Sequence, residues 1–149
     1  MSIRPGLIQM IGAAVLGSVL LPLQGSGEEV TFQLGLSGDQ AVPGPGDEDG
    51  QASGTLTIDD VTGMISWDLA YSNIADPTAM HIHTGAAGER GGVAVPLNVE
   101  TSGGPGTLVG STTAEAASIM EILAAPSDYY VNIHNEEFRP GAIRGQLGD

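Results

Sequence analysis

Short runs of alternating apolar and polar residues cover most of the chain after residue 29. In "VTFQLGL" (30–36) the residues Phe32, Leu34 and Leu36 fall on one face, and "ISWDLAY" (65–71) repeats the pattern. This two-residue period is typical of strands with one buried face. Further runs are "ASGTLTI" (52–58), "GVAVPL" (92–97), "YYVNIH" (129–134) and "AIRGQL" (142–147). Turns rich in Gly, Pro and Asp separate them, which predicts an all-β fold, an antiparallel β-sandwich or barrel.

The run at 92–97 is expected to place Val93, Val95 and Leu97 inward. One segment, residues 113–124, has a helical period instead and predicts one short helix. Its apolar residues at helical spacing are Ala116, Ile119, Met120 and Leu123. Thr112, followed three residues later by Glu115, matches a capping box, and Pro126 marks the expected end.

The first residues have the layout of a secretory signal peptide. Arg4 precedes an apolar run over 7–23, and small glycines follow, so cleavage is expected near Gly27. A retained membrane anchor is the alternative, since the run approaches the roughly 20 residues that span a bilayer. The prediction is a signal peptide over 1–27 and one domain over 28–149, located outside the cytoplasm in a periplasm or at the cell exterior.

The chain is strongly acidic, with a net charge of −14 and no lysine. Removal of residues 1–27 leaves three arginines against all 18 acidic residues, a net charge of −15. Nucleic acid and anionic membranes are therefore excluded as partners, because phosphate binding relies on Lys and Arg. The absence of cysteine excludes disulfides and cysteine chemistry. The acidic run "GDEDG" (46–50) predicts a solvated loop, since its spacing does not match a calcium-binding EF-hand.

The three histidines lie in two of the predicted strands. His81 and His83 are two residues apart, so they share a face, with Cα atoms about 6.6 Å apart. In the run 129–134, His134 shares a face with Tyr130 and Asn132, whereas the apolar residues Val131 and Ile133 point to the other side, as do Met80 and Ile82 in the first strand. If the two strands are neighbours, the three imidazoles converge outside the core.

Three imidazoles without a thiolate suit copper, zinc, iron or nickel, and the general order of affinity favours copper, with zinc as the alternative. Glu136 and Glu137 are candidates for a carboxylate ligand or for an acceptor that orients an imidazole. Asn132 is a further candidate neighbour. Arg144 either borders the histidines or pairs with a nearby acid, and the pairing is favoured. The alternative to a metal site is that the histidines are incidental.

Five segments, in order, give the chain a family resemblance: "LSGDQAVP", "GTLTID", "ISWDLAY", "MHIHTGAAGERGGVAVPL" and "YYVNIHNEEFRPGAIRGQL". Over residues 31–147 the chain resembles the CHRD (chordin-type) domain family. The resemblance implies an extracellular β-sandwich module. The chain departs from the family pattern at "NEEF" (135–138) and in the acidic loop "PGPGDEDG" (43–50).

The chain is also similar, more faintly, to copper–zinc superoxide dismutase, a Greek-key sandwich. That similarity implies copper ligands at His81, His83 and His134. No further histidine is present to match the bridging and zinc ligands of that family, and no cysteine to form its disulfide, so a two-metal enzyme is excluded.

Three functions remain open from the sequence. The first is a secreted, non-enzymatic module that binds a single metal ion through the histidines. The second is an extracellular structural or protein-interaction module without a metal. The third is a copper-only dismutase, although the acidic surface opposes the approach of an anion unless Arg139 or Arg144 creates a local positive field. The oligomeric state is left open.

Overall fold

A computed structural model describes residues 27–99 and 104–148. The predicted signal peptide, apart from Gly27, lies outside these described residues. No helix in the described ranges has the length and apolar character needed to cross a membrane.

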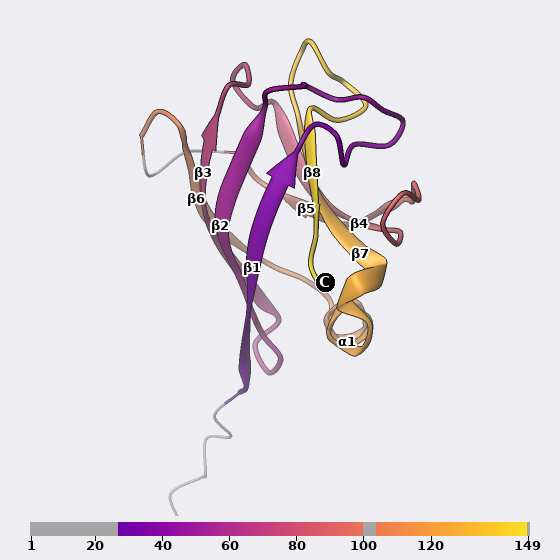
Figure 1. The fold of residues 1–149 in the computed structure, drawn as a ribbon. Coiled ribbons are helices and arrows are strands. Elements are labelled where there is room, and N and C mark those ends of the chain that lie inside the picture. Colours follow the sequence, from indigo (N-terminus) through magenta and orange to yellow (C-terminus); the bar gives the residue numbers. More distant parts are fainter. Residues whose placement is uncertain (1–26, 100–103, 149) are drawn as a thin grey trace, which may run out of the picture.

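Eight strands form a single antiparallel sheet that curls into a nearly closed barrel (Figure 1). They are β1 (Glu29–Ser37), β2 (Gln51–Asp59), β3 (Met64–Ser72), β4 (Ala79–Thr84), β5 (Val93–Leu97), β6 (Thr107–Thr113), β7 (Tyr129–His134) and β8 (Ile143–Gln146). Their order in the sheet is β5-β4-β7-β8-β1-β2-β3-β6, so strands far apart in the sequence lie side by side. The predicted all-β antiparallel sandwich or barrel with one short helix is confirmed.

The core fills the inside of the barrel and follows the predicted alternation. In β3, Ile65, Trp67 and Leu69 are buried and Asp68 is exposed. The other predicted inward residues of β1 and β2 are likewise buried or packed against the core: Phe32, Leu34, Leu36, Leu56 and Ile58. One face of each strand is therefore committed to the core, which leaves the opposite face free to carry polar side chains.

The prediction for β5 was wrong at its first residue. Val95 lies opposite Ile82 and is 3% exposed, but Val93 lies opposite His83 and is 53% exposed. The step of two residues in β5 against one in β4 is a β-bulge, which reverses the alternation at that point. Val93 therefore shares the outer face with His83.

The helix α1 (Ala116–Ala124) lies at the lower end of the barrel in Figure 1. The predicted capping box was wrong, because Thr112 belongs to β6, where it pairs with Ile65, and no side chain caps the helix. The buried positions are Ile119 and Ile122, whereas Met120 is 71% exposed. The helix ends before Pro126, which begins the short 3₁₀ helix η1 (Pro126–Asp128).

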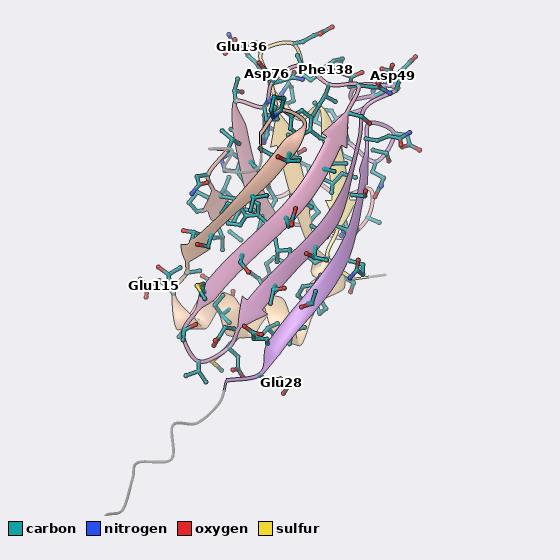
Figure 2. All side chains as sticks on the ribbon, turned by 90° about the vertical axis from the view of Figure 1, so that its left-hand side faces the viewer. Glu28, Asp49, Asp76, Glu115, Glu136 and Phe138 are labelled. Atoms are coloured by element: carbon teal, nitrogen blue, oxygen red, sulfur yellow. The ribbon has the colours of Figure 1, made fainter. Side chains whose placement is uncertain are left out.

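Acidic side chains gather at both ends of the barrel. Figure 2 shows Asp49, Asp76 and Glu136 at one end and Glu28 and Glu115 at the other. In the acidic loop, Glu48 and Asp49 are exposed, as expected for a solvated segment.

Candidate metal centre

The strands that carry the histidines are direct neighbours. β4 pairs with β7 in antiparallel register, with His81 opposite Asn132, His83 opposite Tyr130 and His134 opposite Ala79. Paired residues share a face of the sheet. Met80, Ile82, Val131 and Ile133 occupy the core face of these strands. The three histidines therefore lie together on the outer face, as the alternation of side chains along each strand predicts.

The imidazole nitrogens are close enough to share one ion. One nitrogen from each of His81, His83 and His134 lies within 4.8 Å of the others. The closest pair is Nδ1 of His81 and Nε2 of His134, at 3.2 Å. Two ligands of a tetrahedral ion at 2.0–2.1 Å from each nitrogen are about 3.3 Å apart. This pair already has the separation of two ligands on a single metal.

Backbone carbonyls assign the tautomers of two rings. Nδ1–H of His134 donates to the carbonyl oxygen of Arg139 (2.8 Å), and Nδ1–H of His83 donates to that of Gly91 (3.1 Å). Both Nε2 atoms then carry a lone pair. Nε2 of His134 accepts from Nδ1–H of His81, whereas Nε2 of His83 is buried without a hydrogen-bond partner in the described part of the chain. A buried polar atom without a partner costs about 1–3 kcal/mol.

The surroundings favour uncharged imidazoles. Burial lowers the pKa of His81, and the neighbouring His134 and His83 lower it further. Burial also lowers the pKa of His83, although its hydrogen bond to Gly91 opposes this effect. These two rings therefore remain neutral, with lone pairs available, to a lower pH than an ordinary histidine.

The two glutamates that follow His134 do not join the cluster. The carboxylate of Glu136 accepts from the guanidinium of Arg139 at 2.7 Å, and both side chains are exposed. Glu137 is exposed as well. The groups with metal-binding geometry in the described residues contain no carboxylate. The acceptor that orients His134 is the carbonyl of Arg139 rather than either glutamate.

Asn132 lies between His81 and Arg144 on the outer face, since it pairs with both across neighbouring strands. Its side chain is 5% exposed, and Nδ2 donates to the carbonyl of Pro140 at 3.3 Å. Its Oδ1 is buried and has no hydrogen-bond partner in the residues the structure describes. Asn132 therefore ties β7 to the loop after it, which supplies the Arg139 carbonyl that accepts from His134.

The favoured pairing of Arg144 with an acid was wrong. Arg144 is 1% exposed, and no carboxylate of the described residues lies within ion-pair distance of it. It donates instead to the carbonyls of Glu89 (2.6 Å) and Ala86 (2.8 Å) and to Oε1 of Gln146 (2.8 Å). Carbon Cζ of Arg144 lies 3.4 Å from the centre of the Tyr130 ring. The guanidinium therefore faces the Tyr130 ring, which in turn stacks on His83.

Tyr130 is a neighbour of His83 that was not among the predicted site residues. Its ring stacks on that of His83, with centroids 5.1 Å apart and an interplanar angle of 6°. A signal was present, because the alternation of β7 places Tyr130 on the same face as His134. The carbonyls of Gly91 and Arg139 left no such signal, since any residue supplies a carbonyl.

The model of the CHRD domain family matches residues 32–147. The matched range includes all three histidines, both strands that carry them, and Arg144. Comparisons with curated proteins and with solved structures gave no match. The match spans most of the chain, and the chain belongs to the CHRD domain family.

Proposed function

We propose that this CHRD domain is an exported module that binds a single metal ion through His81, His83 and His134. Copper is the favoured ion and zinc the alternative. The observation that carries the proposal is the buried Nε2 of His83, which has a lone pair and no partner in the described residues. A cation at the centre of the three imidazoles supplies that partner.

The donor set supports this choice of ion. Neutral imidazoles suit copper and zinc, whereas calcium and magnesium prefer oxygen ligands. The chain has no cysteine, and no carboxylate belongs to the cluster of the described residues. Three protein ligands leave a further coordination position for water or a small ligand. Among divalent ions, the general affinity order places copper above zinc.

The test is titration of the purified protein with Cu²⁺ and with Zn²⁺, followed by thermal melting and direct measurement of affinity. An ion that binds only the folded state raises the melting temperature, by the equivalent of about 2.7 kcal/mol at a hundredfold excess over Kd. We expect one ion per chain. His83→Gln and His134→Gln are expected to weaken binding at least as much as loss of an orienting neighbour does, about 10–100-fold.

The control addresses the acidic surface, which attracts cations without any site. Glu136→Gln removes a surface carboxylate outside the cluster and is expected to leave the affinity unchanged. Stabilisation of His134→Gln equal to that of the unmodified protein would contradict the proposal and favour an interaction module without a metal. The proposal of export predicts that the mass of the secreted protein corresponds to a chain that starts near Glu28.

A further inference from the structure

The side chain of Arg144 is a buried cation without an anionic partner in the described part of the chain. It is 1% exposed, although the chain carries 18 acidic residues. Removing a charge from water is unfavourable by several kcal/mol unless hydrogen bonds satisfy the group. Two backbone carbonyls and the amide oxygen of Gln146 satisfy this one. These hydrogen bonds therefore hold in place the loop that supplies the two carbonyls and the side chain of Gln146.

The first group that Arg144 fixes is the loop after β4, residues 85–91. Its guanidinium binds the carbonyls of Ala86 and Glu89 in this loop. Gln146, which accepts from Arg144, donates from Nε2 to the carbonyl of Gly85 at 3.1 Å. Two side chains of β8 thus hold the start and the middle of the loop against the sheet.

The second group is the ring of Tyr130, which lies between Arg144 and His83. The guanidinium contacts the Tyr130 ring, and the ring stacks nearly parallel on His83. A cation over an aromatic face is attracted by the ring quadrupole. The His83 ring therefore packs against one face of the Tyr130 ring, and the guanidinium of Arg144 covers the other face.

Both routes end at the same residue, Gly91. The carbonyl of Gly91 accepts from Nδ1–H of His83, and the N–H of Gly91 donates to the hydroxyl of Tyr130 at 3.4 Å. If the loop moves, the acceptor that selects the tautomer of His83 moves with it. If the Tyr130 ring moves, His83 loses the surface that fixes its plane.

We propose that Arg144 is a positioning residue for His83: by fixing the loop 85–91 and the ring of Tyr130, it holds His83 as the Nδ1–H tautomer and directs Nε2 into the histidine cluster. Its effect on affinity rests on the proposed metal-binding function. Its effect on the tautomer does not, because the network that produces it is present in the metal-free protein.

The experiment compares Arg144→Met with Arg90→Met in the full protein. Arg90 is exposed, precedes Gly91 and makes no hydrogen bond or ion pair with the described residues. Both variants remove one positive charge close to His83, but only Arg144→Met removes the contacts to the loop and the ring. Imidazole ¹⁵N NMR of the metal-free proteins reports the tautomer of His83, and Zn²⁺ titration reports the affinity.

We expect Arg144→Met to reduce the Nδ1–H population of His83 and to weaken Zn²⁺ binding about 10–100-fold, as loss of an orienting neighbour does. Arg90→Met is expected to leave the tautomer unchanged and to alter the affinity by less than about threefold, because it removes only a screened surface charge. An unchanged tautomer in a folded Arg144→Met protein would overturn the inference, and so would equal effects of the two variants.

Three further variants keep the test decisive if Arg144→Met does not fold. Arg144→Lys keeps the charge but lacks the planar fork that reaches several acceptors, so it is expected to behave like Arg144→Met. Full rescue by lysine would contradict a positioning role. Tyr130→Leu removes the ring and is expected to shift the tautomer, whereas Tyr130→Phe keeps the stack and is expected to shift it less.

The tautomer and the affinity separate the two proposals. A tautomer shift in Arg144→Met, combined with no Zn²⁺ or Cu²⁺ binding by the unmodified protein, would support the positioning role and contradict the metal-binding function. Binding by the unmodified protein, combined with no effect of Arg144→Met on tautomer or affinity, would support the metal-binding function and contradict the positioning role.

Discussion

The Nδ1 atom of His81 lies 3.2 Å from the Nε2 atom of His134. Because Nδ1 of His134 donates to the carbonyl of Arg139, the shared proton belongs to His81. An ion that binds both nitrogens requires this proton to move to Nε2 of His81, so that the ring stays neutral and Nδ1 gains a lone pair. Protons and metal therefore compete for the same position.

The pH dependence of metal binding follows from protonation of the rings, because the second proton of an imidazolium and a metal ion compete for the same lone pair. Burial lowers the pKa of His81 and of His83, so near neutral pH few protonated rings have to lose a proton to the ion. We expect the Kd for Zn²⁺ to change little above the ordinary histidine pKa of about 6.5 and to rise only at lower pH. Competition with a chelator between neutral and acidic pH measures this. A steep rise in Kd that begins above neutral pH would contradict the expectation.

The same lowered pKa values make the stability of the metal-free protein sensitive to acid. In the unfolded chain, His81 and His83 take up protons near their ordinary pKa, whereas in the folded protein they do so only at lower pH. Their contribution to stability is therefore present above about pH 6.5 and is lost as the pH falls through the folded pKa values.

The double variant His81→Gln/His83→Gln is expected to lose less stability on acidification than the unmodified protein. Melting temperatures of both metal-free proteins across this pH range test it, and the acidic residues that they share contribute equally to both. A constant difference between the two proteins at all pH values would show that the burial of these rings has no such effect.

Gly141→Ala is expected to destabilise the fold more than Gly88→Ala. Both glycines have positive φ, +142° for Gly141 and +81° for Gly88, so an alanine is strained at either position, by about 1–3 kcal/mol. A Cβ at Gly141 would also lie 2.5 Å from Oδ1 of Asn132, whereas nothing lies within 4 Å of one at Gly88. Urea unfolding gives the two free energies, and a smaller loss for Gly141→Ala would contradict the packing of Asn132.

The bulge in β5 predicts opposite outcomes for two neighbouring valines. Val95→Ala removes buried apolar surface and is expected to lower the free energy of unfolding by about 2 kcal/mol. Val93→Ala, at a side chain that is 53% exposed, is expected to change it by less than about 0.5 kcal/mol. Equal losses at both positions would mean that the alternation continues through β5 without a bulge.

The sequence predicts the fold class and the convergence of the histidines because both depend on a period of two. Alternation identifies the core face of each strand, and His81, His83 and His134 fall on the other face. The alternation does not determine which strands are neighbours. The cluster exists because β4 pairs with β7. A one-residue bulge, as at Val93, also cannot be predicted from a fixed period of two residues.

The other errors have a common cause, which is that tertiary pairing overrides a local pattern. Thr112 has the spacing of a helix cap, but it pairs with Ile65 in the sheet. Arg144 was expected to find an acid because acids are abundant in the chain. Its nearest acceptors are carbonyls of a loop more than fifty residues away in the sequence. A sequence pattern that depends on side-chain identity does not show such partners.

The groups that orient His83 and His134 are main-chain carbonyls, those of Gly91 and Arg139. Except at glycines such as Gly91 and Gly141, where a Cβ would overlap neighbouring atoms, exchange of a side chain in these two loops leaves the oxygen atoms in place, whereas insertion or deletion of one residue displaces them. The loops after β4 and β7 are therefore expected to tolerate drift in residue type during evolution but to resist change in length. A library of single-residue insertions and deletions across both loops should lose metal binding far more often than a substitution library of the same size.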